Sequence, residues 1–286
     1  MVAGIDVPNR NGSVDEAALL AIAERVVEMA APGEQVEAVV VHECETEIRA
    51  YEGQVESLTS AESQGVGIRV VRDGRQGFAY AGTLAGDSST QVLQEARDNV
   101  EFATPDEYCA VAEPDGVPFA DLNLYRPELE GHPTADKVAM ALELERQTRA
   151  ADSRITGVES AEYGDSVAVG AVATTTGIRS TSRETGCFLS AFALAEQDGE
   201  TQTGFGFSLG RAPGDLDVEF AASEAAERST RMLGATKPDS GRITVVLDPW
   251  VSAQFLMIVA GTLSGEAVQK GRSLFAGRLG DEVAAP

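Results

Sequence analysis

The chain has 286 residues, 43% of them hydrophobic, which is enough to fill the cores of two domains of ordinary size. Its 22 basic and 46 acidic side chains leave a formal charge of −24 at pH 7, which disfavours direct binding to nucleic acids or to anionic membranes. No run approaches about 18 consecutive apolar residues. The acidic N-terminal stretch also lacks the basic region of a secretory signal, so we expect a cytoplasmic protein.

A helix is predicted near the N-terminus. Ser13, Val14, Asp15 and Glu16 have the spacing of a capping box, and apolar residues follow at helical period until Pro32.

Antiparallel strands are predicted to follow this helix. Short strands are expected at residues 36–42, 46–51 and 55–60. Asp73 and Gly74 supply the positive φ angles of a two-residue turn, which joins predicted strands at residues 64–72 and 76–81. Four glycines in and beside these strands predict bulges, tight bends or the close approach of another backbone: Gly65, Gly67, Gly77 and Gly82.

A second helix is predicted at residues 88–100, with its apolar residues on one face. Between residues 103 and 133 the periodicity fails, and prolines crowd the sequence. We interpret this stretch as a partly extended crossing between two lobes.

The second lobe repeats the order of the first. A helix at residues 134–151 precedes five alternating strands, and a helix at residues 216–233 closes the unit, with Gly234 at its C-terminal cap. The strands are predicted at residues 155–163, 167–173, 178–183, 188–195 and 201–209, with turns at Gly164-Asp165, Thr176-Gly177, Thr185-Gly186 and Asp198-Gly199. An internal duplication would explain this repeat, but the sequence similarity between the halves is too weak to establish it.

Residues 242–247 form an apolar run that predicts a strand, and Asp248 and Pro249 predict the start of a helix through about residue 262. One strand and one helix cannot make a core, so we expect the start of a domain that is cut short. The predicted fold class is α+β, with two helix/antiparallel-sheet/helix lobes followed by the start of a third, β-rich C-terminal domain. The predicted boundaries are 1–104, a Pro-rich linker at 105–133, 134–236 and 237–286.

Few residues suit catalysis. His42 and Glu43 resemble the start of a zinc-binding His-Glu-x-x-His helix, but position 46 is Thr, and on a strand the two side chains would point to opposite faces. His132 is predicted to be an exposed loop residue. No Gly-x-Ser-x-Gly elbow or phosphate-binding loop is present, so we predict no catalytic, cofactor-binding or metal-binding residue in this chain.

The cysteines also give no indication of a redox or metal site. Cys44, Cys109 and Cys187 lie far apart and form no Cys-x-x-Cys motif, which favours buried, reduced thiols. A redox or metal role is the alternative.

Two features remain as candidate binding regions. An antiparallel sheet with free edges can accept an extended peptide as an added strand, although its strands can equally pair only with each other. The second feature is the polar, glycine-rich segment at residues 263–275, for which an ordinary loop is the alternative.

Several motifs resemble those of the TldD/PmbA family, the modulators of DNA gyrase. They are Val55-Glu56-Ser57, residues 65–70, residues 73–79, residues 242–248, residues 263–268 and Gly271-Arg272-Ser273. The resemblance implies a family of metallopeptidases. In its TldD type, a His-Glu-x-x-x-His motif after the strand equivalent to residues 242–247 binds zinc. The corresponding residues 248–256 contain no histidine, so the chain resembles the PmbA/TldE type, which lacks the metal motif.

The function implied by this resemblance is that of a noncatalytic subunit of a heteromeric metallopeptidase that acts on short or unfolded peptides. The zinc would belong to a TldD-type partner, and the chain would form a hetero- or homo-oligomer. Residues expected to contact the peptide or the partner are Ser264, Gly265, Glu266, Arg272 and Ser273.

Two alternatives belong to other classes. One is a noncatalytic acidic binding module that acts on DNA gyrase or another DNA-handling protein by imitating the charge of DNA; the spread of acids along the whole chain weakens it. The other, an autonomous hydrolase, has little support because the candidate nucleophiles lack a base.

Overall fold

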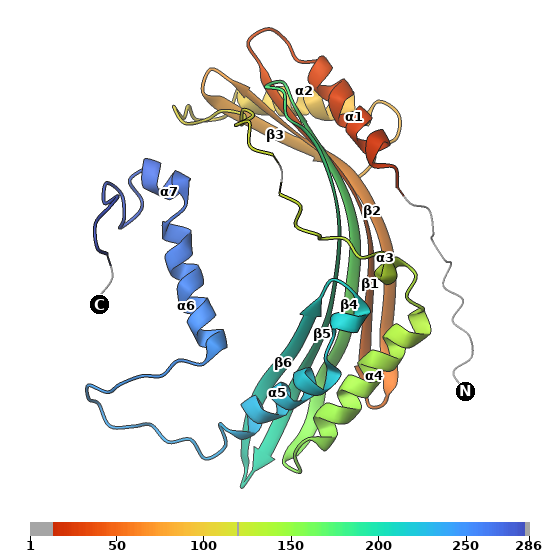
Figure 1. Cartoon of the computed structure of the whole chain (residues 1–286), viewed down its shortest axis with the longest axis vertical. Coiled ribbons are helices and arrows are strands. Elements are labelled where there is room, and N and C mark those ends of the chain that lie inside the picture. Colours follow the sequence, from red (N-terminus) through yellow and green to blue (C-terminus); the bar gives the residue numbers. More distant parts are fainter. Residues whose placement is uncertain (1–13, 119, 284–286) are drawn as a thin grey trace. The chain divides into compact units, whose positions relative to one another are not determined.

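The structure is a computed structural model, and it describes residues 14–118 and 120–283 (Figure 1). The chain divides into two compact units, Met1–Ala235 and Thr236–Pro286. The first unit holds the sheet and its helices.

One curled sheet of six antiparallel strands organises the first unit, in the order β3-β2-β1-β4-β5-β6 (Figure 1). The prediction of an α+β fold is confirmed. The two halves of the chain do not have a sheet each, because β1 pairs with β4 from Glu37↔Thr174 to Ala50↔Ala161 and joins them. The strands are β1 (Gln35–Tyr51), β2 (Gln54–Arg72), β3 (Arg75–Ala81), β4 (Ile155–Thr174), β5 (Arg179–Gln197) and β6 (Glu200–Gly210).

Four helices cover one face of this sheet. In β1 the even-numbered residues Val36, Ala38 and Val40 are buried beneath helices, while odd-numbered residues such as Val41 and Glu45 are exposed on the other face. We call the uncovered side, which carries the odd-numbered residues of β1 and the residues paired with them, the open face.

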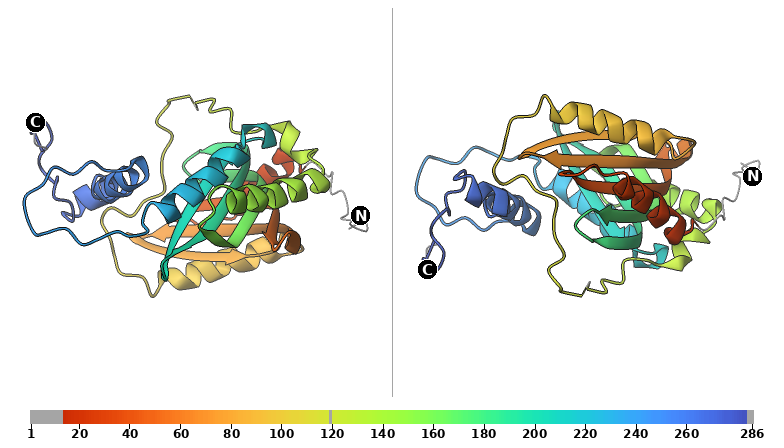
Figure 2. Two further views of the ribbon diagram at one scale, coloured as in Figure 1. Left: turned by 90° about the horizontal axis from the view of Figure 1, so that it is seen from below. Right: turned by 90° about the horizontal axis from the view of Figure 1, so that it is seen from above.

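The helices form two cores over the two halves of the sheet (Figure 2). One core includes Val26, Ile68 and Leu93, and the other includes Leu144, Tyr163 and Leu189. The covering helices are α1 (Glu16–Glu28) and α2 (Ser88–Val100) over the first half, and α4 (Thr134–Ala150) and α5 (Val218–Thr230) over the second. Two shorter elements are α3 (Pro127–Glu130) and the 3₁₀ helix η1 (Pro213–Asp215).

Glycines let these helices approach the sheet closely. A Cβ added at Gly77 would lie 2.0 Å from the carbonyl oxygen of Ala96 in α2, and one at Gly206 would lie 2.0 Å from that of Ala221 in α5. Position 77 therefore requires glycine because the backbone of α2 lies close to it, which is one of the three explanations predicted for the glycines of these strands.

The strands are longer and less interrupted than predicted. The predicted strands at residues 36–42 and 46–51 are one strand, β1, and the turns predicted at Gly164-Asp165 and Thr185-Gly186 lie inside β4 and β5. These residues do not end the strands because the two neighbouring strands pair with the backbone on both sides. Gly164, for example, lies opposite Glu47 of β1 and Phe188 of β5.

The predicted helices are found with end shifts of a few residues or less. At the start of α1, Asp15 accepts a hydrogen bond from the backbone N–H of Ala17 at 2.9 Å, while Ser13 of the predicted capping box lies outside the described residues. The Pro-rich stretch is held to the sheet at several points, among them the bond from Asp106 N to Gly74 O at 2.7 Å.

The second unit contains α6 (Pro249–Thr262) and α7 (Gly265–Gln269). The strand predicted at residues 242–247 is wrong, because this stretch has no regular structure and the described residues of the second unit contain no strand. Many apolar side chains of α6 are exposed, including Phe255, Leu256 and Ile258. No helix in the described ranges is long and apolar enough to cross a membrane.

Candidate functional site

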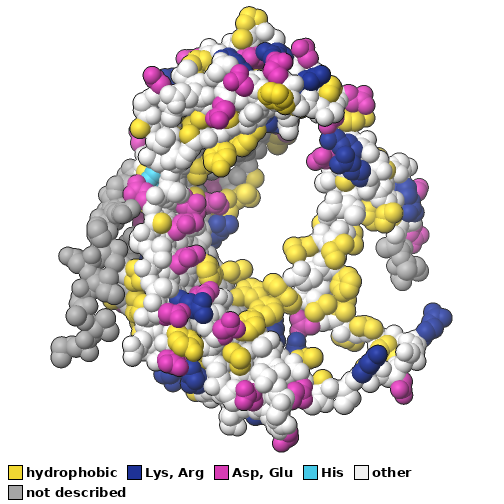
Figure 3. Space-filling view, turned by 180° about the vertical axis from the view of Figure 1, so that it is seen from behind, with side chains coloured by type: hydrophobic (Ala, Val, Ile, Leu, Met, Phe, Trp, Pro, Cys, Tyr) yellow, Lys and Arg dark blue, Asp and Glu magenta, His cyan; other side chains and the backbone are white. Residues whose placement is uncertain are grey.

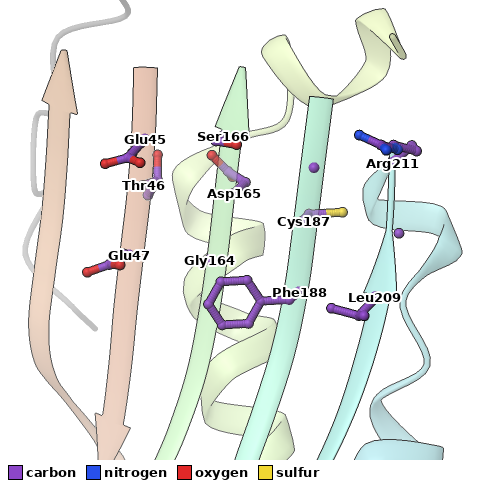
Figure 4. A pocket seen from close by; sticks show the side chains of 12 residues that line it. Glu45, Thr46, Glu47, Gly164, Asp165, Ser166, Cys187, Phe188, Leu209 and Arg211 are labelled. Atoms are coloured by element: carbon purple, nitrogen blue, oxygen red, sulfur yellow. The ribbon is translucent and has the colours of Figure 1, made fainter. Parts of the chain in front are cut away.

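The open face carries a groove of about 500 Å³ between β1, β4, β5 and β6 (Figure 4). Its lining combines acidic, apolar and very small side chains, and acidic and hydrophobic side chains are interspersed along the curved sheet in Figure 3. The lining residues are Glu45, Thr46, Glu47, Gly164, Asp165, Ser166, Gly186, Cys187, Phe188, Leu209, Gly210 and Arg211.

An apolar row crosses the groove. In the register of the sheet, Glu47 lies opposite Gly164, Gly164 opposite Phe188, and Phe188 opposite Leu209. The ring of Phe188 lies against Gly164, because a Cβ added there would be only 2.2 Å from the ring (Figure 4). Leu209 is 67% exposed, so the row offers an apolar surface to a ligand.

The next row leaves open space. It runs from Glu45 to Ser166 and Gly186. A Cβ added at Gly186 would meet nothing closer than the hydroxyl oxygen of Ser166, at 3.9 Å. Packing therefore does not require glycine at this position, and its missing side chain widens the groove.

Acidic side chains line the β1 side of the groove. Glu45 and Glu47 are exposed, and neither side chain makes a hydrogen bond or ion pair with any residue that the structure describes. Glu43 lies in the third row, with Ala168 and Glu184. Burial, followed by the charges of Glu45 and Glu184, raises the pKa of Glu43 above its ordinary value, although a hydrogen bond from Ser166 partly opposes the rise.

A second, smaller groove of about 200 Å³ continues along the same face. It lies over Ala168 and Gly170 of β4, and Val39, Val41 and Glu184 are among its other lining residues. The open-face positions of β4 are thus small from one groove to the next, since Gly164 and Ser166 line the first.

Arg211 closes the β6 end of the larger groove. Its guanidinium donates to the carbonyl of Thr185 at 2.8 Å and lies 3.5 Å from the carboxylate of Glu184. Asp215 accepts from the backbone N–H groups of Ala212 and Arg211, in that order of effect, and these bonds hold the pKa of Asp215 below its ordinary value.

A buried ion pair lies on the helix-covered side of the same strands. Asp165 accepts from Lys137 Nζ at 2.5 Å and from the hydroxyl of Tyr163 at 2.7 Å. The side chains of Lys137 and Asp165 are only 10% and 5% exposed, so each charge depends on the other. These contacts are internal and anchor α4 to the sheet.

Cys187 lies beside this pair and is not an activated thiol. Burial, aided by the charges of Asp165 and Asp215 and opposed by Lys137, raises the pKa of Cys187 to about 11. The thiol is therefore protonated at neutral pH and a poor nucleophile. All three cysteines are free, but the prediction of buried thiols holds for Cys187 only, because Cys44 and Cys109 are half-buried.

The two histidines do not form a shared site. His42 is 8% exposed on the covered face, with its Nε2 atom 2.8 Å from the carboxylate of Glu62, and Glu43 lies on the opposite face as predicted. His132 lies in a loop but is half-buried, not exposed as predicted, and its buried Nε2 atom has no hydrogen-bond partner among the described residues.

The predicted contact residues lie together in the second unit. The Ser264 hydroxyl accepts from Ala267 N at 3.2 Å at the start of α7, and Glu266 pairs with Lys270 at 3.1 Å within that helix. Gly265 is the first residue of α7, and the N–H of Arg272 donates to Ala267 O at 2.8 Å. Ser273 accepts from Phe275 N at 2.9 Å. These are local contacts, and a role in binding stays a prediction.

The groove itself was not predicted from the sequence. Glu43, Glu45 and Glu47 alternate with other residues, which was the available signal for an acidic strand face, but Glu43 and Glu45 fell between the strands predicted at residues 36–42 and 46–51. Nothing in the sequence indicated that Phe188 and Leu209 lie on the same face, because that depends on strand register.

The fold and groove define an α+β protein with one antiparallel sheet, which helices cover on one face and which carries a groove on the other. Sequence profiles described as PmbA/TldA metallopeptidase domain 1, central domain and C-terminal domain match residues 36–100, 127–233 and 240–286. The chain belongs to the PmbA/TldD metallopeptidase family.

Three named relatives agree with this membership. The chain is 24% identical to Metalloprotease PmbA of Escherichia coli O157:H7, 27% identical to a metalloprotease TldD homolog of Haemophilus influenzae and 26% identical to a metalloprotease of Methanothermobacter thermautotrophicus. The alignments cover 81%, 78% and 82% of this chain but 52%, 48% and 51% of the relatives. The chain therefore spans about half the length of the relatives it matches.

Solved structures share the fold. A candidate modulator of DNA gyrase from Thermotoga maritima matches with a TM-score of 0.69 and 26% identity, over 93% of this chain and 59% of that one. Another from Bacteroides thetaiotaomicron matches with a TM-score of 0.80 and 23% identity, over 95% and 62%. TldE from Thermococcus kodakarensis matches with a TM-score of 0.69 and 16% identity, over 91% and 57%.

The residues present do not fit the metal that a metallopeptidase requires. Among the described residues, no group of three or more His, Cys, Asp or Glu side chains is placed to hold a metal ion. At the start of α6 the only acid is Asp248, and its carboxylate accepts from Trp250 N at 2.9 Å. Trp250 and the apolar side chains that follow offer no metal ligand.

Proposed function

We propose that the chain is a noncatalytic, PmbA/TldE-like subunit of a heteromeric cytoplasmic metallopeptidase that acts on short or unfolded peptides. The observation that carries the proposal is the groove on the open face, found in a member of a metallopeptidase family whose described residues do not fit a metal. In this division of work, the chain holds the peptide and a TldD-type partner supplies zinc and the general base.

The geometry of the groove suits an extended peptide. Its floor along β4 is made of Ser166 and Ala168, whose small side chains let a backbone lie close to the sheet, while the ring of Phe188 lies over Gly164. Phe188 and Leu209 on one flank offer apolar contacts, which exclude water from part of the bound chain. The contribution of this chain is therefore to bind and orient the peptide.

The second unit belongs to the same proposal. The match of residues 240–286 to the family's C-terminal domain supports a domain boundary near residue 237. The proposed boundaries of the preceding parts are 1–104, 105–133 and 134–236. We assign Ser264, Gly265, Glu266, Arg272 and Ser273 to contact with the peptide or the partner, since they gather around one short helix.

Metal analysis and peptide cleavage test this proposal. The protein is purified alone and together with a TldD-type partner that carries the His-Glu-x-x-x-His motif, and bound zinc and peptide cleavage are measured for each preparation. We expect cleavage only when the partner is present, and no stoichiometric zinc in this chain alone. A partner with its motif histidines changed to alanine serves as the control. Stoichiometric zinc and cleavage by this chain alone would overturn the proposal.

A second candidate function has its own supporting observations. Two of the structures with this fold are described as candidate modulators of DNA gyrase, and the charge of −24 suits a mimic of DNA. Binding to gyrase should then weaken steeply as salt is raised, because screening reduces the attraction between charged surfaces. Binding that is unchanged between low and high salt would exclude charge mimicry.

A further inference from the structure

We propose that the groove on the open face selects extended peptides that carry basic side chains beside an apolar one. This inference deepens the proposed function, on which it rests, by naming the class of peptide.

The groove holds negative charge that the described residues do not balance. Elsewhere on the open face, acids are paired: Glu37 lies 3.3 Å from Arg69, and Glu162 lies 3.9 Å from Arg49. Glu45 and Glu47 have no such partner among the residues that the structure describes. A ligand with basic side chains would supply the missing charges.

Acidic side chains crowd together on the β1 side of the groove. Glu43 lies two residues before Glu45 on the same face of β1. Burial, and then the charges of Glu45 and Glu184, disfavour the ionised form of Glu43. Repulsion between like charges is relieved when a cation binds among them. A basic side chain is therefore held more favourably here than a neutral one.

The spacing of the acids matches that of an extended peptide. Glu43, Glu45 and Glu47 project from the same face of β1, so successive side chains lie roughly 6.8 Å apart. Alternate side chains of an extended peptide have the same repeat. A peptide along the small residues of β4 would place basic side chains against β1 and an apolar side chain against Phe188.

A second copy of the chain fits this surface poorly. The same acidic groove would have to meet another acidic surface, because the chain carries 46 acidic and only 22 basic residues. Facing like charges across an interface is costly. A cationic peptide is therefore the occupant that the charges favour.

Fluorescence anisotropy with the full chain tests the inference. The probes are three labelled peptides of equal length with blocked ends and one central phenylalanine, which carry two arginines, two glutamines or two glutamates at alternate positions. We expect the arginine peptide to bind about tenfold more tightly than the glutamine peptide, since each exposed ion pair contributes up to about 1 kcal/mol. The glutamate peptide should bind most weakly.

Matched variants separate the groove from the overall charge. Changing Glu45→Gln and Glu47→Gln together should weaken the arginine peptide roughly fivefold and leave the glutamine peptide unchanged. The control variant changes Glu28→Gln and Glu95→Gln, which are exposed on the helices and alter the net charge by the same amount. It should bind all three peptides as the unchanged protein does.

Each other outcome overturns the inference in a distinguishable way. Equal binding of all three peptides would reject the charge preference and leave the proposed peptide-binding subunit intact. An equal loss in both double variants would show that net charge, not the groove, attracts the peptide. If no peptide binds and the chain self-associates through this face, both the inference and the proposed binding of peptides in the groove are wrong.

Discussion

Gly206 on the covered face of the sheet and Gly186 on the open face have opposite structural roles. On the covered face, a Cβ at Gly206 would lie 2.0 Å from the backbone oxygen of Ala221, so glycine is required for helix packing. On the open face, a Cβ at Gly186 would meet only the Ser166 hydroxyl, at 3.9 Å. Glycine can therefore be needed for close packing of a helix on one face of the sheet and leave space for a ligand on the other face.

The charged side chains of the groove differ in the same way from those buried beneath α4. On the covered side, Lys137 and Asp165 are buried and paired at 2.5 Å. On the open side, Glu45 and Glu47 are exposed and have no ion-pair partner in the described parts of the chain. We therefore expect covered-face substitutions to change stability, and open-face substitutions to change binding.

The largest effect on stability is expected from Lys137→Met. It removes the cation and leaves the buried Asp165 carboxylate uncompensated, which should cost about 3–5 kcal/mol of the free energy of unfolding. Urea denaturation followed by circular dichroism measures the change. The double variant Lys137→Met with Asp165→Leu removes both charges and should recover much of the loss; a full loss in the double variant would mean that packing, not charge, is responsible.

Gly206→Ala should have the next largest effect. The added methyl group overlaps the backbone of α5, which cannot move aside as a flexible side chain would, so we expect a loss of about 3 kcal/mol. The matched control is Gly186→Ala on the open face. Equal destabilisation by the two substitutions would remove the distinction between the faces.

Glu34→Gln should destabilise the protein in a pH-dependent way. Burial raises the pKa of Glu34, but hydrogen bonds from the Arg97 side chain and the Ala31 N–H, with the charges of Arg97 and Arg72, outweigh it and lower the pKa below 4.5. The carboxylate therefore stabilises the fold above its unfolded pKa. This contribution, about 2 kcal/mol for hydrogen bonds to a charged group, is lost as the pH falls through the folded pKa.

Denaturation of the unchanged protein and of Glu34→Gln across a range of pH measures this effect. The difference in unfolding free energy should be constant near neutral pH and should shrink in acid. A difference in unfolding free energy that does not change with pH would show that the fold is stabilised by the shape of the Glu34 side chain and not by its charge.

The smallest effect on stability is expected from substitutions at Gly186. Gly186→Ala should change the free energy of unfolding by less than about 0.5 kcal/mol, because no atom other than Ser166 Oγ lies within 4 Å of the new Cβ. Gly186→Leu should also fold but should fill part of the groove and weaken binding of every peptide tested. Peptide binding that survives the leucine unchanged would place the peptide elsewhere.

The sequence predicted much of this fold because its signals are local. The capping residues and apolar periods indicated the main helices, and Asp73-Gly74 indicated the turn between β2 and β3. The strand predicted at residues 242–247 failed because an apolar run forms a strand only when a neighbour pairs with it. The single sheet was missed because pairing of β1 with β4 joins residues far apart in the chain.

The candidate site was less predictable than the fold. The alternation of Glu43, Glu45 and Glu47 is visible in the sequence, but many acids of this chain are equally visible. The row that brings Glu47, Gly164, Phe188 and Leu209 together is set by the register of three strand pairs. Such a register depends on the packing of whole strands, so short motifs do not reveal it.

Site-specific photo-crosslinking tests most directly whether the open face is where peptides bind. The photoreactive residue p-benzoylphenylalanine replaces Leu209 on the open face or, as the matched control, Phe220 on α5; these side chains are 67% and 52% exposed. Each variant is irradiated with the labelled arginine peptide, alone and with the TldD-type partner. We predict crosslinking at position 209 and none at position 220. Crosslinking at position 220 alone, or equally at both, would contradict the assignment of peptide binding to the open face.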